Sequence, residues 1–273
     1  WRTWAPSARV RPGWTGSVAG CRRGADSVRH RRASQRALNF VRDLAGLDPV
    51  TVTDALSRRA LAAALIMDAN DALSHYPPRS WRCWTKTGAT AAGRSNLLWA
   101  SAVTVGSALR GYLSDWGASN TAVGHRRWLL YPFTTTMGSG STSQANAFWV
   151  LGASDPSRAN PAYVGWPTEG WFPSALEPQG RWSLSSGQDS ARFGSAKVRV
   201  VRVASGAVVK VTRRQVVDGY GMPTLVWDMP RRFARTGAYR VTVSGIGEQG
   251  SSATTSTSYV VRLFAPVRPG RAR

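Results

Sequence analysis

The segment Gly124-His125-Arg126-Arg127-Trp128, together with Leu73-Ser74-His75-Tyr76-Pro77-Pro78, decides how this chain is interpreted. The sequence has only three histidines, and two of them lie in these turn-rich segments, each at the end of a predicted element. Asp115 ends the helix predicted between them. Two imidazoles and a carboxylate on separate elements can bind zinc, or can act as general acid and base. The spacing does not choose between these roles, and hydrogen-bonded structural histidines remain the simplest interpretation.

Outward from these segments, the first half of the chain is predicted to alternate helices with few strands. Apolar residues at helical spacing predict helices over 34–46, 54–67 and 102–115, with Ser34 and Thr53 or Asp54 as N-caps of the first two. Short apolar and aromatic runs predict buried strands over 127–131 and 147–151. This order is typical of a layered α/β/α domain, which we expect over residues 34–153.

The second half is predicted to be rich in strands. After a polar linker over 154–161, strands are expected over 181–184, 197–203, 208–211, 224–227, 239–243 and 258–264. Their alternation predicts one face in a core and one in water, as in a small β-sandwich over 154–265. The predicted fold class is therefore α+β: an α/β/α three-layer sandwich followed by a small all-β, immunoglobulin-like sandwich. Residues 266–273 are expected to be a disordered basic tail.

Tryptophans are numerous, and four fall in or before the predicted β-domain: Trp166, Trp171, Trp182 and Trp227. Exposed and coplanar, they would form a platform for sugar rings. Buried, they are large core residues, which is the interpretation that we favour.

The formal net charge is +22 over 273 residues. Arginines are spread through every segment, and no recognition helix or zinc-finger spacing is present, so specific nucleic-acid binding is not expected. Adhesion to anionic wall polymers or lipid surfaces stays open as a general electrostatic effect. No apolar run reaches the ~18 residues that a membrane-spanning helix needs, so no transmembrane segment is expected. No signal peptide is recognisable at the start of the sequence, which suggests that one was removed or that the chain is a fragment.

Cys21 and Cys83 are the two cysteines. A disulfide between them is favoured over two unrelated buried thiols, because neither lies at the short spacing of a metal knuckle. The bond would tie an N-terminal arm, residues 1–33, to the first domain and would imply an oxidising, extracytoplasmic setting.

Three further polar features have simpler alternatives. His30 lies among arginines, and we expect it to be a solvated residue of the arm. Arg126 and Arg127 could grip a carboxylate or phosphate in a cleft. A strand end more often exposes one such arginine and pairs the other with an internal carbonyl or acid. A serine-hydrolase triad is not expected, because no Gly-x-Ser-x-Gly motif is present.

Several segments of the first domain resemble the CAP superfamily, which comprises cysteine-rich secretory proteins, antigen 5 and plant pathogenesis-related proteins. The order and spacing of the matching elements agree across residues 36–153. The matching segments are Leu38-Asn39 with Arg42, the Ala-rich second helix, Leu73-Ser74-His75, Gly93-Arg94-Ser95-Asn96-Leu97, Gly124-His125 before the predicted strand, and the strand with Trp149.

The resemblance implies a central cleft with two histidines and two acidic residues, sometimes with a divalent metal. His75 and His125 match the histidines, and Asp115 stands where a glutamate of the third helix is expected. The second acidic residue is missing, since Gly93-Arg94-Ser95-Asn96 offers none. The predicted cleft residues are thus His75, Ser95, Asn96, Asp115, His125 and Arg126. His75 and His125 are the candidate ligands of zinc or another divalent metal, and the direction of Arg94 is left open.

The pattern looks like a bacterial branch of the superfamily. In that branch a cysteine of the N-terminal arm accompanies the one after the Pro-Pro turn, which supports the Cys21–Cys83 pairing, and a β-domain is appended.

The function expected first is a secreted or wall-associated, monomeric, non-enzymatic binding module for a small-molecule, lipid or cell-wall ligand. A metal-assisted hydrolase acting on peptide or wall polymer, with His75, Asp115 and His125 as candidate catalytic residues, is the alternative. A wall-adhesion protein led by its β-domain is the third.

Overall fold

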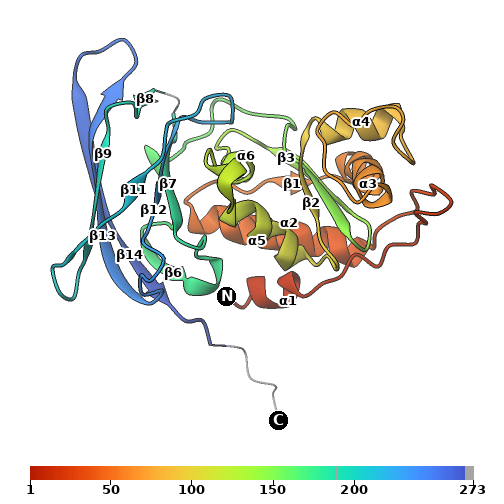
Figure 1. The fold of residues 1–273 in the computed structure, drawn as a ribbon, viewed down its shortest axis with the longest axis horizontal. Helices are drawn as coiled ribbons and strands as arrows, with labels where there is room; N and C mark the ends of the chain where they lie inside the picture. Colours follow the sequence, from red (N-terminus) through yellow and green to blue (C-terminus); the bar gives the residue numbers. More distant parts are fainter. Residues whose placement is uncertain (189, 268–273) are drawn as a thin grey trace.

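The computed structural model describes residues 1–188 and 190–267, which form two layered halves packed side by side (Figure 1). The helices are α1 Trp4–Ala8, α2 Val28–Leu44, α3 Asp54–Ala69, α4 Lys86–Ala92, α5 Val105–Ser114 and α6 Gly124–Leu129, with 3-10 turns η1 Ala118–Asn120 and η2 Ser174–Leu176. The strands of the first half are β1 Thr51–Val52, β2 Ser95–Trp99, β3 Thr136–Ser141 and β4 Ala145–Trp149. Those of the second half are β5 Tyr163–Trp166, β6 Gly170–Pro173, β7 Arg181–Ser186, β8 Ala191–Arg192, β9 Lys197–Arg202, β10 Val208–Val209, β11 Thr212–Arg213, β12 Thr224–Asp228, β13 Gly237–Glu248 and β14 Thr254–Phe264.

The first half is an α/β/α sandwich. Its sheet has the order β1-β3-β4-β2, with β1 parallel to β3 and the other pairs antiparallel. Helices α3 and α4 cover one face, while α2 and α5 lie against the other (Figure 1). The predicted three-layer arrangement is confirmed.

Small residues allow α3 to lie directly on the sheet. Ala60, Ala63 and Ala64 are fully buried, and a Cβ at Gly140 of β3 would lie 2.1 Å from the Leu61 nitrogen. The backbone of β3 therefore contacts that of α3 where any other residue would clash.

Helix α2 begins earlier than its predicted cap at Ser34. Ser27 is the N-cap and accepts a hydrogen bond from the His30 backbone nitrogen. His30 and Ala33 extend the buried stripe that continues through Ala37 and Val41. Arg31 and Arg32, which lie between His30 and Ala33, make this first turn polar, so the sequence did not show its helical periodicity. His30 is consequently 1% exposed, and the expectation of a solvated residue was wrong.

The strand predicted over 127–131 is also wrong, because this segment begins within α6. The backbone nitrogens of Arg127 and Leu130 bond the carbonyls of Val123 and Arg126, as in a helix. Periodicity does not distinguish strand from helix in an apolar run this short. The structure shows a helix here, and the side chains of the neighbouring residues Arg126 and Arg127 are both buried in the protein.

The second half consists of two sheets. One has the order β10-β9-β13-β14-β6, with β8 also paired to β13, and the other has the order β11-β12-β7-β5. Trp166, Trp182 and Trp227 are fully buried, whereas Trp171 is 69% exposed. Three of the four tryptophans are thus core residues, and no platform of coplanar rings forms from this set.

The two halves share one continuous cluster of buried apolar residues, which runs from Trp4 through Val150 to Leu263. The linker is tied down as well, since Arg158 donates to the carbonyls of Thr134 and Pro49. The division at residues 153/154 therefore stays a prediction. The predicted disordered tail falls almost entirely on residues 268–273, outside the described residues.

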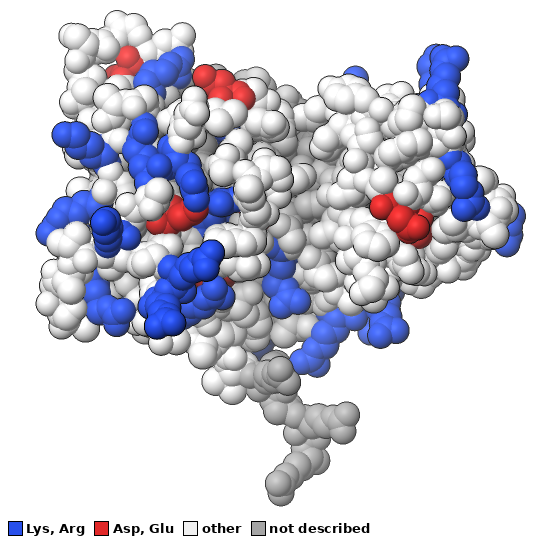
Figure 2. Space-filling model, viewed as in Figure 1, with Lys and Arg blue, Asp and Glu red and all other residues white. Residues whose placement is uncertain are grey.

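Within residues 1–188 and 190–267, no helix is long and apolar enough to cross a membrane. Figure 2 shows Lys and Arg side chains gathered over the β-domain, with few Asp and Glu among them.

Candidate functional site

A cavity of about 450 Å³ lies where α6, the start of β2, the segment after β4 and a loop of the β-domain meet. His75, Ser95, Asn96 and His125 all line it, so the fold brings together residues that are far apart in sequence. The lining residues are His75, Tyr76, Gly93, Arg94, Ser95, Asn96, Ser119, Asn120, Ala122, Gly124, His125, Trp128, Val150, Leu151, Gly219 and Tyr220. The last two belong to the β-domain, a contribution that the sequence did not indicate.

His75 is fixed by a backbone carbonyl. Its Nδ1 lies 2.9 Å from the carbonyl oxygen of Ala92 at the end of α4. Because a carbonyl only accepts hydrogen bonds, Nδ1 must carry the proton. In the neutral imidazole the Nε2 atom then has a free lone pair.

His125 is fixed by Asp115. Its Nδ1 lies 2.6 Å from Asp115 Oδ1, and Asp115 Oδ2 accepts from the backbone nitrogen of Arg126 at 3.1 Å. Asp115 is 1% exposed and ends α5 in the left-handed conformation, with φ +46. Its carboxylate is therefore a support behind His125, since both oxygens are engaged and neither faces the cavity. As with His75, Nδ1 donates this hydrogen bond, and Nε2 is an acceptor when the imidazole is neutral.

Asn96 and Tyr112 support the floor of the cleft. The Asn96 amide donates to the carbonyl of His125 at 2.9 Å, and the Tyr112 hydroxyl reaches Asn146 Oδ1 at 2.8 Å. The Tyr112 ring also lies against the His125 imidazole, with centroids 5.7 Å apart. Burial raises the pKa of Tyr112 well above its ordinary value, so this hydroxyl stays a donor.

Ser95 is the unsatisfied group of the cleft. It is 4% exposed, and its Oγ has no hydrogen-bond partner among the described residues. A buried hydroxyl without a partner costs about 1–3 kcal/mol, so a group that bonds it would recover this free energy.

Arg94 is exposed and lies over the Trp149 ring, with its guanidinium carbon 5.8 Å from the ring centroid. It lines the cavity, and no Asp or Glu among the described residues does. The segment in which the resemblance implies a second carboxylate thus brings a positive charge to the cavity.

Arg126 does not line the cavity; it points into the junction of the two halves. It donates to the carbonyls of Leu113 and Ser114 and to Ser183 Oγ of the β-domain. Arg127 likewise donates to the carbonyls of Met222 and Val217. Burial lowers the pKa of both guanidinium groups to about 10, so they stay charged at neutral pH. Neither side chain is exposed at an end of the element, contrary to our expectation.

The donor set does not fit a divalent metal. Among residues 1–188 and 190–267, no group of three or more His, Cys, Asp or Glu side chains is placed to hold an ion. Two histidines supply two nitrogens, whereas a catalytic zinc site uses three protein ligands. The carboxylate that would complete the set is committed to His125 and a backbone amide.

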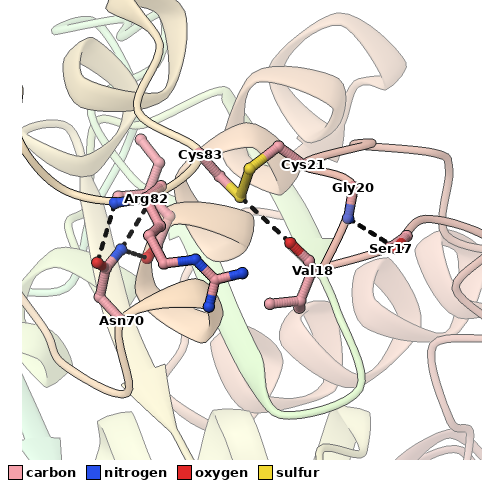
Figure 3. Close-up of a disulfide and its surroundings, with 8 residues drawn as sticks. Ser17, Val18, Gly20, Cys21, Asn70, Arg82 and Cys83 are labelled. Atoms are coloured by element: carbon pink, nitrogen blue, oxygen red, sulfur yellow. Dashed lines mark hydrogen bonds between the residues drawn. A yellow bond between two sulfur atoms is a disulfide. The ribbon is translucent and has the colours of Figure 1, made fainter.

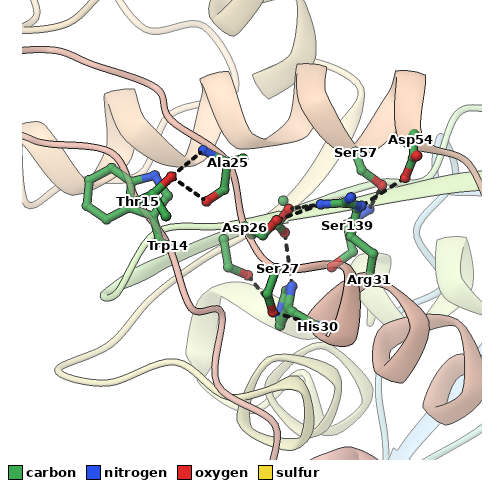
Figure 4. Close-up of polar contacts among 12 residues, drawn as sticks. Trp14, Thr15, Ala25, Asp26, Ser27, His30, Arg31, Asp54, Ser57 and Ser139 are labelled. Carbon is green, nitrogen blue, oxygen red and sulfur yellow. Dashed lines mark hydrogen bonds and ion pairs between the residues drawn. The ribbon is translucent and has the colours of Figure 1, made fainter.

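A second polar cluster surrounds His30 (Figure 4). His30 Nδ1 lies 2.9 Å from Asp26 Oδ2, and His30 Nε2 lies 3.4 Å from Ser141 Oγ. The connectivity is that of a Ser-His-Asp triad, but Ser141 is fully buried and Arg31 pairs with the same aspartate. A nucleophile must reach its substrate, so this cluster is structural and fastens α2 to β3.

The predicted Cys21–Cys83 disulfide is confirmed (Figure 3). It joins the N-terminal segment to the loop between α3 and α4, the same loop that carries His75. Asn70, just after α3, exchanges two hydrogen bonds with the Arg82 backbone, each 3.0 Å long. The disulfide and the hydrogen bonds between Asn70 and Arg82 therefore both restrain the loop that carries His75.

The fold and the cleft define the first half as an α/β/α sandwich domain with paired histidines in a cavity and a disulfide-anchored loop. Residues 35–152 match the family model CAP, the cysteine-rich secretory protein family. The match spans less than half of the chain, so the assignment to the CAP family is made for residues 35–152.

None of the curated proteins matches the chain. Among solved structures, PcoC, a methionine-rich copper resistance protein from Escherichia coli, matches at 12% identity, covering 39% of this chain and 100% of its own, with a TM-score of 0.29.

Proposed function

We propose that this protein is an extracellular binding module whose cleft takes a small polar ligand without chemical conversion. The observation that carries the proposal is the buried, unpartnered Ser95 hydroxyl in the wall of a cavity that two histidines line. A ligand that bonds this hydroxyl recovers the free energy that its burial costs. The two Nε2 acceptors would orient the same ligand.

The cleft lacks the ligand set that metal-assisted hydrolysis needs. Among the described residues its lining holds no carboxylate, and Asp115 lies behind His125 with both oxygens occupied, so any general base would have to be an imidazole. The metal-assisted hydrolase is thus the weaker alternative, because the third ligand of its metal is missing.

The extracellular setting is supported by chemistry and by family. Disulfides persist in oxidising compartments, and the Cys21–Cys83 bond anchors the loop of His75. The CAP family to which residues 35–152 belong is described as secretory. A monomer remains part of the proposal.

A fragment titration tests the binding role. The full chain, labelled with ¹⁵N at histidine, is titrated with neutral amides, polyols and small oxyanions, and the Nε2 resonances of His75 and His125 are recorded. We expect at least one compound class to shift both resonances. In Ala122→Trp, whose new ring fills the cavity, the shifts should disappear. Unshifted resonances with every class would refute the binding role. Casein hydrolysis that requires both added zinc and His125 would establish the hydrolase instead.

One further observation favours wall adhesion as a second role. The outward face of the β9-β13-β14 sheet carries the exposed cations Lys197, Arg199, Arg240 and Arg262, which alternate with buried valines. Such a face attracts anionic polymers. The full chain carrying Arg199→Gln, Arg240→Gln and Arg262→Gln should sediment less with isolated cell walls at low salt. Undiminished sedimentation would exclude this face.

A further inference from the structure

We infer that the cleft recognises an acidic sugar, with Arg94 and Ser95 holding its carboxylate or phosphate group and His75 and His125 accepting from its hydroxyls. This inference rests on the proposed function and specifies the class of ligand.

The charge of the cleft selects for an anion. Among the described residues its lining contains Arg94 and no Asp or Glu. A second hollow shares His75, Tyr76, Gly93 and Arg94 with the cavity and adds Arg79, and none of its described lining residues is acidic. The two hollows are therefore adjacent, and we refer to them together as the groove; the Asp, Glu, Lys and Arg residues described in its lining are Arg79 and Arg94, both positive.

Arg94 has its donors free. Among the described residues, its guanidinium makes no side-chain hydrogen bond or ion pair, and its contact is the face of Trp149. Stacking on the ring restrains the guanidinium, while the N–H groups at its edge stay available. A planar, restrained guanidinium with free donors suits bidentate binding of a carboxylate or phosphate.

Ser95 supplies the neighbouring donor. Its hydroxyl is buried in the cavity wall and has no partner in the described part of the chain. Once a rotation of the Ser95 side chain brings this buried atom to the cavity surface, an oxyanion held by Arg94 would accept from the hydroxyl and remove the unsatisfied donor.

The histidines set a second requirement, which is that the ligand carries hydrogen-bond donors. Both Nδ1 atoms donate to protein oxygens, so each imidazole, in its neutral form, offers an Nε2 acceptor. A bare oxyanion has nothing to donate to them, whereas a molecule with hydroxyl groups beside its anionic group does. Hydroxyls next to a carboxylate or phosphate are the chemistry of uronic acids and sugar phosphates.

The groove extends beyond the cavity that the histidines line. It continues from the cavity past Tyr76, which is 88% exposed, toward Pro77 and Pro78. An exposed aromatic ring beside the path offers a face on which a second sugar ring can pack. We therefore expect an oligomer to bind more tightly than a monosaccharide.

Calorimetric titration of the full chain at low ionic strength tests the inference. The probes are trigalacturonate, glucose 1-phosphate and, as the neutral control, maltotriose. Arg94→Gln should weaken the anionic probes by at least about tenfold, and Ser95→Ala by several-fold. The matched control is Arg59→Gln, because Arg59 lies over the same Trp149 ring at 5.9 Å but does not line the groove. It should leave binding unchanged within about twofold.

The outcomes separate this inference from the proposed function. If Arg59→Gln weakens binding of the anionic probes as much as Arg94→Gln does, the effect is one of net charge, and the proposed anion subsite at Arg94 is overturned. Maltotriose bound as tightly as trigalacturonate, and unaffected by Arg94→Gln, would overturn the anionic class while leaving a polar-ligand cleft. A triglutamate peptide that binds as tightly as trigalacturonate would overturn the sugar. Failure of all the anions would also overturn it, and the fragment titration would then decide the proposed function alone. The preferred source follows from which anion binds more tightly, the carboxylate or the phosphate.

Discussion

At the scale of single residues, Asp115 shows how one side chain fixes the chemistry of another. Its left-handed backbone at the end of α5 turns the carboxylate toward His125 and the Arg126 amide at once. Asp and Asn are the residues that tolerate this conformation best after glycine. The result is an imidazole whose Nδ1–H faces inward to the carboxylate and whose Nε2 remains for the cleft.

We expect Asp115→Asn to lower the free energy of unfolding by about 1–3 kcal/mol. Asparagine fits the backbone but has one acceptor oxygen, so either the His125 imidazole or the Arg126 amide loses its partner. Urea denaturation measures the loss, and ¹⁵N spectra should show His125 losing its single Nδ1-protonated tautomer while His75 keeps its own. Unchanged stability and an unchanged His125 spectrum would contradict the role of Asp115 as a support.

At the scale of elements, the start of α6 shapes the cleft. Val123 has a left-handed backbone with φ +48, and Gly124 follows it against the ring of Tyr220. A Cβ on Gly124 would lie 2.7 Å from Tyr220 Cδ1. The glycine thus lets a side chain of the β-domain form one wall of the cavity.

Gly124→Ala should displace the Tyr220 ring and lower stability by about 1–2 kcal/mol through overpacking. The matched control is Gly93→Ala, which also lines the cavity but has φ −68 and no atom nearer than 3.4 Å to the new Cβ. Thermal unfolding reports the loss of stability. Tyr220 fluorescence, compared between the two glycine variants, which have the same tyrosines, reports the displacement of the ring. An alanine at 124 that moves neither measurement would show that the Tyr220 wall adapts freely.

The disulfide acts on the element level too, because it closes a loop between residues 62 positions apart. Replacing both cysteines by serine should lower the free energy of unfolding by roughly 3–4 kcal/mol on the chain-entropy model. Denaturant titrations of the variant, and of the native protein under reducing conditions, should give the same loss. A native protein that reductant does not destabilise would contradict the disulfide.

At the scale of the whole molecule, buried arginines join the CAP domain to the β-domain. Arg181 of β7 donates to the carbonyls of Asp115 and Gly117, and Arg127 donates to Met222 from the opposite side. Asp228 balances Arg181 and Arg214 within the β-domain. The carbonyls at and just after the end of α5 thus accept hydrogen bonds from a charged arginine of the second half.

Acid should weaken this junction through Asp228. Burial favours a higher pKa for this carboxyl, but hydrogen bonds to Arg181 and Arg214 outweigh burial and hold the pKa below its ordinary value. Its charge therefore stabilises the fold above the unfolded pKa, and the stabilisation is lost as the pH falls below about 4 toward the folded pKa.

Asp228→Asn should cost roughly 3 kcal/mol at pH 7, because it leaves buried Arg181 without its counter-charge. The difference from the native protein should shrink as the pH is lowered through this window, as measured by urea denaturation at several pH values. Asp155→Asn is the control, since that carboxylate is fully exposed and bonds only its neighbour Ser157. A constant difference down to pH 2 would contradict the linkage.

The sequence by itself determined the α/β/α layering, the second helix with its Thr53 cap, the strand-rich second half and the pairing of Cys21 with Cys83. It also determined which residues could meet in a cleft, because His75, Ser95, Asn96 and His125 lie in the recognisable segments. The layering, the cap and the strand-rich half follow from local periodicity and turn chemistry, which a linear sequence carries directly. The cleft residues followed from the resemblance to the CAP superfamily.

Only the tertiary structure decided what each polar group does. The sequence predicted Arg126 and Arg127 at the end of a strand, whereas the structure places them in α6 with both side chains in the junction. It predicted a solvated His30, whereas α2 begins at Val28 and buries this residue. Tyr220 and Gly219 reach the cavity from the β-domain, and Ser95 is seen to lack a partner only in three dimensions. Burial and hydrogen-bond satisfaction depend on contacts between distant segments, so they are properties of the packed chain and leave no mark in local sequence.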